Sequence, residues 1–144
     1  MFMLNELLIK ELSEQVGINT SDIQAIKDGE IYSTNEVKTG KKYIKNGIEK
    51  DIYRKDIYYE VSGSTITSLS SINIDEITDY ESLCYRAGNN LDVEKPYYIS
   101  STDYFRSFLR RIGTVYQIET RITVASGYAG YLIKTTIEYT KTTD

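Results

Sequence analysis

Histidine and tryptophan are absent from this chain of 144 residues, and proline and cysteine occur only once each. Without histidine, the commonest general base and the commonest zinc ligand are both missing. Cys84 has no partner for an internal disulfide, which is typical of a protein assembled in a reducing cytoplasm. The sequence also lacks the G-x-S-x-G, P-loop, C-x-x-C and H-E-x-x-H motifs. We therefore expect no catalytic residues, no metal site and no cofactor.

Long apolar runs and an overall positive charge are missing as well. The longest apolar run near the start, Leu7–Ile9, is far shorter than the roughly 20 residues of a membrane-spanning helix. Residues 1–30 hold two lysines and six acidic residues, a balance of −4, whereas residues 31–144 hold fifteen of each sign. Such an acidic arm and neutral body produce no field that attracts phosphate groups. We expect neither membrane insertion nor a nucleic-acid partner.

The first thirty residues carry the only helical pattern. Residues 3–16 are predicted to form a helix, because apolar side chains recur there at three- and four-residue spacing. This apolar stripe consists of Leu4, Leu7, Leu8, Leu12 and Val16. A second short helix is predicted at about residues 21–27. The stripe can pack on the protein's own sheet, or on the same helix of neighbouring copies.

Residues 11–29 can also be read as a helix-turn-helix of the repressor type, with Gly17 in the turn. A recognition helix has to approach phosphates and base edges. Here it would lie in an arm of net charge −4, and residue 30 already begins a strand pattern. The composition of the arm thus argues against DNA binding.

From residue 30 onward the apolar period changes to two, and all fourteen tyrosines lie at position 32 or later. Tyr53, Lys55, Ile57, Tyr59 and Val61 are predicted to share one face of a strand. Asn46-Gly47 is a strong signal for a tight type I′ hairpin turn. About seven short strands without intervening helices predict an antiparallel β-sandwich or barrel. We therefore divide the chain into a helical arm, residues 1–29, and a β domain, residues 30–144.

Tyrosines and arginines cluster between residues 97 and 110. Tyrosine beside arginine can stack on sugars or nucleotides. The candidate ligand-binding residues are Tyr97, Tyr98, Tyr104, Arg106 and Arg110. In a strand, Arg111 points away from Arg106 and Arg110, so interface salt bridges or a solvated face are the alternative. Acidic pairs such as Asp75-Glu76 could hydrolyse glycosides, but such pairs in β-rich loops are usually solvated.

Two segments resemble a β-rich C-terminal domain found on structural proteins of bacteriophages and prophages of Gram-positive and related bacteria. They are Tyr32–Gly47, which contains TGKKYI, with its continuation through Ile52–Lys55 (IYRK), and the closing run Gly130–Asp144, which ends in EYTKTTD. In that family a strand with a TGK-aromatic-Ile step turns through a glycine-containing loop into a strand carrying (I/L)YRK, and the domain ends on GY…EYTKTTD. The resemblance covers roughly residues 31–144, with its middle matching only as a pattern of strands.

The resemblance implies a virion protein with a jelly-roll-like β-sandwich, assembled in the cytoplasm of the host bacterium. It favours a homotrimer in which the apolar stripe joins copies or docks on another capsid or tail protein. Only about thirty residues precede the domain, which favours a small decoration or head-fibre protein over a complete tail fibre. The alternative function is a receptor-binding module of a tail fibre or baseplate, which would attach to cell-surface carbohydrate through weak, repeated sites.

Overall fold

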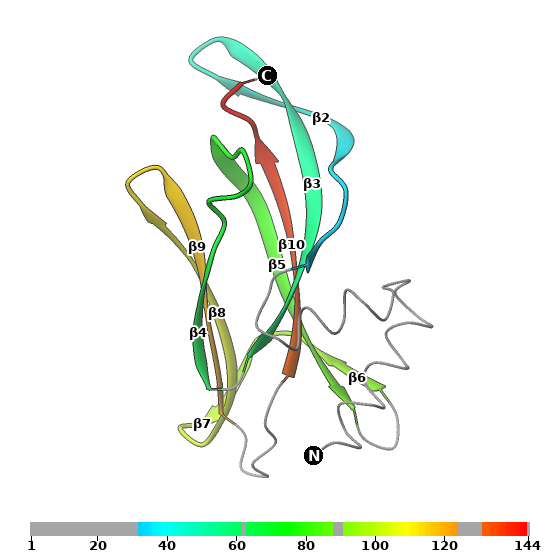
Figure 1. Ribbon diagram of the computed structural model, residues 1–144, viewed down its shortest axis with the longest axis vertical. Helices are drawn as coiled ribbons and strands as arrows, with labels where there is room; N and C mark the ends of the chain where they lie inside the picture. The colour runs from blue at the N-terminus through cyan, green and yellow to red at the C-terminus, as the bar shows by residue number, and fades with distance from the viewer. Residues whose placement is uncertain (1–31, 62, 88–90, 124–130, 144) are drawn as a thin grey trace.

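The computed structural model describes residues 32–61, 63–87, 91–123 and 131–143, and every element in them is a strand (Figure 1). One sheet has six strands: β1 (Tyr32–Ser33), β2 (Val37–Lys45), β3 (Ile48–Val61), β5 (Glu76–Ala87), β6 (Leu91–Glu94) and β10 (Tyr131–Thr140). The other has four: β4 (Ser64–Ser68), β7 (Tyr97–Ser100), β8 (Asp103–Ile112) and β9 (Val115–Thr123). All pairings are antiparallel, which confirms the prediction of a mainly β, antiparallel domain. The predicted helices, residues 3–16 and 21–27, lie outside the described residues.

The long strand β3 organises the six-stranded sheet. It pairs with β10 along one edge and with β1 and β2 along the other, and β5 and β6 follow beyond β10 (Figure 1). The four-stranded sheet runs in the order β4-β9-β8-β7. The last strand of the chain therefore lies between two much earlier ones, a pairing that has to form across a long stretch of sequence.

The β2–β3 hairpin forms at the predicted turn. Asn46 and Gly47 have φ angles of 53° and 76°, and Lys45 pairs with Ile48 across the two residues. Both central residues of a type I′ turn need positive φ, and asparagine and glycine are the residues that adopt it most readily. The turn prediction is confirmed.

Alternate residues of both sheets point into one shared core. Tyr59 of β3 and Ile133 of β10 pack there against Phe105 of β8 and Ile118 of β9, and all four are at most 3% exposed. The predicted common face of β3 is confirmed, because its odd-numbered residues pair with the odd-numbered, core-facing residues of β10. Burial of these side chains is the main force holding the two sheets face to face.

A chain of buried hydroxyl groups crosses this core. The Tyr59 hydroxyl lies 3.0 Å from Thr120 Oγ1 of β9 and 2.9 Å from Thr135 Oγ1 of β10. From Thr135 the chain continues to Ser82 Oγ of β5 at 2.8 Å and then to Ser107 Oγ of β8 at 2.9 Å. Polar atoms in a dry core need such partners, so the chain fixes the relative position of the two sheets.

The period-two pattern that begins at residue 30 is interrupted before Val37. The alternation from Ile31 to Val37 predicted one strand, but β1 ends at Ser33 and β2 begins at Val37. At Thr34 the backbone N–H still donates to Asp56 O at 2.9 Å, as in the ladder, but Asp56 N donates to the Thr34 hydroxyl at 2.9 Å where a strand would offer the backbone carbonyl. Further along, residues 64–68 form β4, Leu69 then enters the core, and β5 begins at Glu76.

The outer face of the six-stranded sheet is apolar near its centre. Tyr58, Tyr85 and Leu132 point away from the shared core, yet each is at most 7% exposed. Within the described residues, no strand packs over this face. This second buried region was not predicted from the strand pattern.

Candidate binding surface

The outer face of the four-stranded sheet gathers aromatic and arginine side chains. Along β8 the odd residues, such as Phe105, enter the core, so the even residues face outward. The outward set, which we call the Arg–aromatic face, consists of Tyr98 on β7, Tyr104, Arg106, Phe108 and Arg110 on β8, and Glu119 and Arg121 on β9. Residues from three strands thus meet on one surface.

Four of the five candidate ligand-binding residues belong to this face: Tyr98, Tyr104, Arg106 and Arg110. Tyr97 does not, because it pairs with core-facing Phe105, and its hydroxyl donates to Asp103 Oδ1 at 2.7 Å.

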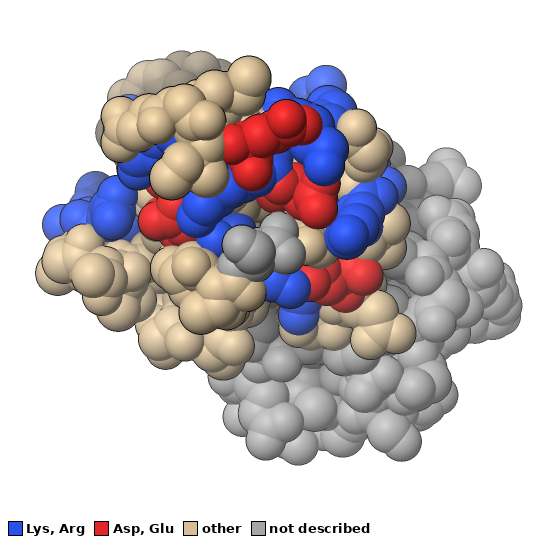
Figure 2. Space-filling model, turned by 90° about the horizontal axis from the view of Figure 1, so that it is seen from above, with Lys and Arg blue, Asp and Glu red and all other residues tan. Residues whose placement is uncertain are grey.

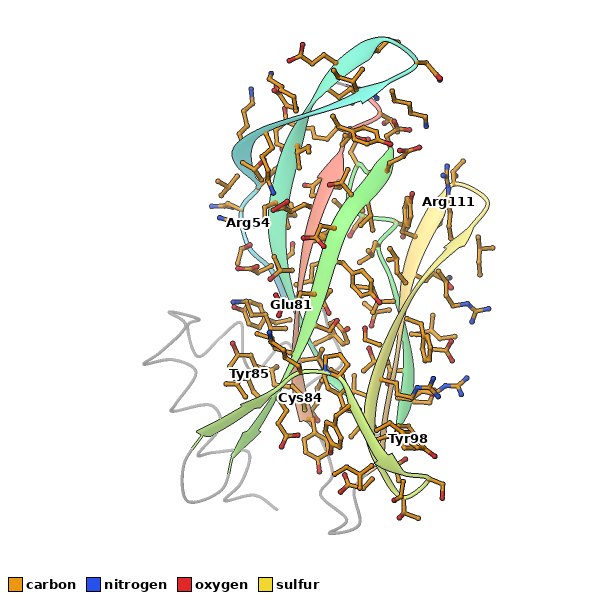
Figure 3. All side chains as sticks on the ribbon, turned by 180° about the vertical axis from the view of Figure 1, so that it is seen from behind. Arg54, Glu81, Cys84, Tyr85, Tyr98 and Arg111 are labelled. Atoms are coloured by element: carbon orange, nitrogen blue, oxygen red, sulfur yellow. The ribbon has the colours of Figure 1, made fainter. Side chains whose placement is uncertain are left out.

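Arg111 is also separate from the Arg–aromatic face, as its strand position predicts. Its guanidinium lies 5.3 Å from the ring centre of Tyr116, the residue directly opposite on β9. Figure 3 shows Tyr98 and Arg111 at opposite ends of the four-stranded sheet. Arg111 therefore offers a natural control for the arginines of the face.

Two of the three arginines on the face share one carboxylate. Glu119 accepts from Arg121 Nη2 at 2.8 Å and from Arg110 Nη1 at 3.2 Å. The hydrogen bond from Arg121 holds the pKa of Glu119 below its ordinary value, and Glu119 in turn raises the pKa of Arg121. Glu119 is therefore ionised at neutral pH and already occupied.

Arg106 has a different environment. It stands directly opposite Arg121 in the β8–β9 register, and its guanidinium lies over the Phe108 ring at 4.9 Å. In the part of the chain that the structure describes, no carboxylate lies within ion-pair distance of Arg106. Like charges directly opposite each other are unfavourable in a sheet. Among the described residues, the two arginines at this position have one nearby carboxylate, Glu119, and it is bound to Arg121 rather than to Arg106.

Shallow hollows flank Phe108. One of about 250 Å³ is lined by Pro96, Tyr98, Arg106 and Phe108, together with neighbouring residues of β7 and β8. A second, of about 340 Å³, lies on the other side of the ring, against Arg110 and the Glu119–Arg121 pair. Both hollows combine an aromatic wall with a guanidinium, a lining that suits a polar ligand with an apolar face.

At the end of the molecule formed by the β2–β3 hairpin, basic and acidic side chains alternate on the surface (Figure 2). Ion pairs join Lys38 and Lys42 to Asp51, Lys41 to Glu138, Lys45 to Glu76, Lys50 to Asp75 and Lys141 to Glu36. The acidic pair Asp75-Glu76, which we considered for catalysis, is thus paired with lysines. A mosaic of this kind attracts neither polyanions nor polycations strongly.

The remaining chemistry is sparse. Cys84, the single cysteine of the sequence, is 2% exposed and lies on the core face of β5. Among residues 32–61, 63–87, 91–123 and 131–143, no cluster of three metal-ligating side chains occurs. The same residues contain no helix long and apolar enough to cross a membrane.

Comparison with protein-family models, with curated protein sequences and with solved structures gives no match to this chain. The surface therefore has to be interpreted from its own residues. Sequence reasoning missed Phe108, Glu119 and Arg121 as parts of it, although the alternation along β8 already placed Phe108 on the same face as Arg106.

Proposed function

We propose that this protein is a structural component of a phage or prophage virion and that it acts by binding rather than by chemistry. The observation that supports this is the placement of the segments carrying the resemblance. Thr39–Ile44 and Ile52–Lys55 lie in β2 and β3, and the closing run forms β10, which pairs with β3 over nine residue pairs. Motifs from the two ends of the domain therefore form one continuous part of one sheet.

Side-chain contacts join these segments further. The Tyr139 hydroxyl and the Lys141 ammonium both donate to Glu36, the latter at 2.7 Å, and Lys141 also lies 4.4 Å from the ring centre of Tyr53. The rings of Tyr53 and Tyr139 stand 6.2 Å apart. Tyr53 belongs to the IYRK motif, and Tyr139 and Lys141 belong to EYTKTTD. The residues of the resemblance thus stabilise one another, as parts of a single family motif should.

Within this proposal the protein is a small fibre or decoration protein displayed on the particle. Residues 30–144 would form a jelly-roll-like sandwich, and the arm, residues 1–29, would anchor it to a capsid or tail protein. The two antiparallel sheets around one core support the sandwich. The resemblance also implies a homotrimer.

Particles from the native phage or induced prophage test the proposal. We expect the protein to be found in purified virions by mass spectrometry, and electron microscopy of particles with and without the gene to reveal missing density. Light scattering on the isolated protein should give the mass of a trimer. Purified virions without the protein, in a host that expresses it, would refute the structural function, and a catalytic turnover would refute action by binding.

The Arg–aromatic face favours a second candidate, a carbohydrate-binding module that attaches the particle to its host. Stacking rings and guanidinium groups on an exposed sheet face suit sugar recognition better than they suit decoration alone. Labelled protein should then bind host cells, and Tyr98→Ala should weaken that binding. Ile112→Ala, an exposed apolar change at the other end of the sheet, is the matched control. If Tyr98→Ala and Ile112→Ala bind host cells equally well, the Arg–aromatic face does not attach the particle to its host, and the function of a decoration protein remains.

A further inference from the structure

We infer that the Arg–aromatic face binds an acidic saccharide, whose carboxylate lies between Arg106 and Arg121 and whose rings stack on Tyr98 and Phe108. This inference rests on the carbohydrate-binding candidate above and adds the chemical class of the ligand.

The charge arrangement calls for an anion. Arg106 and Arg121 are direct cross-strand neighbours, and Glu119 is already shared between Arg121 and Arg110. The Arg–aromatic face therefore carries three guanidinium groups and one carboxylate, and that carboxylate is ion-paired to Arg110 and Arg121. A ligand carboxylate beside Arg106 would remove the unfavourable like-charge pairing and accept charge-assisted hydrogen bonds. Arginine is suited to this role because its planar fork matches the two oxygens of a carboxylate.

The aromatic groups are placed to receive sugar rings. Tyr98 is 62% exposed, and its ring lies 5.9 Å from that of Tyr104 in a tilted arrangement. Phe108 separates the two hollows, and one of them also contacts Tyr98. The C–H groups on one face of a sugar ring are apolar and slightly positive, so they pack on the negative face of an aromatic ring. Adjacent sugar units can occupy the two hollows on either side of Phe108.

The polar groups of the face suit the hydroxyl groups of a saccharide. Glu119 lies in the middle of the face and is ionised, and its oxygens can accept hydrogen bonds from sugar hydroxyls beside the guanidinium donors. The guanidinium groups are hydrogen-bond donors and Glu119 is an acceptor, so the face can bind sugar hydroxyl groups, each of which both donates and accepts.

Titration calorimetry on the full chain tests the inference with two matched probes. One is a tetrasaccharide of galacturonate, and the other is its methyl ester, which keeps the rings and hydroxyls but loses the charges. We expect the acid to bind at least about tenfold more tightly than the ester, and added salt to weaken only the acid. Arg106→Gln should lower affinity for the acid at least about tenfold and leave the ester unaffected.

Two further variants show whether the loss of affinity in Arg106→Gln comes from the missing guanidinium hydrogen bonds or from the missing positive charge. Arg106→Lys keeps the charge but not the fork, and should recover only part of the affinity. Arg111→Gln removes an arginine from the same strand that lies outside the face, and should bind like the unchanged protein. Thermal unfolding of each variant shows whether the sheet is intact.

The results of these experiments distinguish a failure of the acidic-saccharide inference from a failure of the carbohydrate-binding function on which it rests. If the galacturonate tetrasaccharide and its methyl ester bind with equal affinity, and Tyr98→Ala weakens both, the protein binds carbohydrate but does not require an acidic one. If neither saccharide binds, and neutral glucan and host cell-wall polysaccharide also fail, both proposals fall. Tighter binding of a single-stranded oligonucleotide than of the tetrasaccharide would overturn the choice of a saccharide.

Discussion

Replacing Tyr59 by phenylalanine removes the hydroxyl that joins the two sheets and leaves the ring in place. Tyr59 is 3% exposed, and its hydroxyl contacts Thr120 and Thr135, both fully buried. Thr135 keeps a hydrogen bond to Ser82, whereas Thr120 loses the side-chain partner that the structure gives it. Two hydrogen bonds are lost at about 1 kcal/mol each, and one hydroxyl is stranded at a further cost of about 1 kcal/mol.

We therefore expect Tyr59→Phe to lower the free energy of unfolding by about 2–3 kcal/mol. For a chain of this size that is roughly 6–12 °C in melting temperature. Urea denaturation should show a lower midpoint with an unchanged slope, because the surface exposed on unfolding stays the same. Tyr98→Phe, which removes an exposed hydroxyl, is the control and should change stability by less than about 0.5 kcal/mol.

The double variant Tyr59→Phe/Thr120→Val makes the test sharper. Valine replaces the stranded hydroxyl with a methyl group, so the double variant should be more stable than Tyr59→Phe by about 1 kcal/mol. A loss below about 0.5 kcal/mol in Tyr59→Phe, or no recovery in the double variant, would show that the hydroxyl chain does not hold the sheets together.

Three further predictions concern pH and the arm. Burial, followed by the hydrogen bond to Glu36, raises the pKa of Tyr139 above its ordinary value of 10.0, so stability in urea should fall as pH rises above about 10, and Tyr139→Phe should reduce that fall. Burial raises the pKa of Glu36, but the hydrogen bonds from Lys141 and Tyr139 outweigh burial, so the pKa of Glu36 is lowered overall. The stability that Glu36 contributes is therefore lost as pH falls below about 4.5. Glu36→Gln should make the loss of stability at acid pH, followed by circular dichroism, less steep. Deletion of residues 1–29, the predicted anchoring and oligomerisation arm, should leave the β domain folded by circular dichroism and lower the mass in light scattering from a trimer to a monomer; an unchanged trimer would place self-association in the β domain.

Local signals in the sequence were sufficient for the hairpin and the strand faces. Asn46-Gly47 determines its own turn, because the φ angles required are a property of these two residues. The alternation in β3 and β10 determines which side chains enter the core, because burial follows the pleat. The break at Thr34 was not predictable in this way, since it involves a hydrogen bond from Asp56 N, distant in sequence, to the Thr34 hydroxyl. The helical arm remains a prediction, because it lies outside the described residues.

The candidate surface shows where such reasoning stops. Spacing along β8 places Arg106, Phe108 and Arg110 on one face, and it correctly separates Arg111. It cannot say which side chain stands opposite Arg106, because that depends on the register with β9 and on the turn between the strands. The register places Arg121 there, so two arginines stand opposite each other, and among the described residues only Arg121 of the two forms an ion pair with Glu119. The chemistry of the surface therefore arises from strand pairing, and a shift of one residue in that pairing would bring Thr120 opposite Arg106 and abolish it.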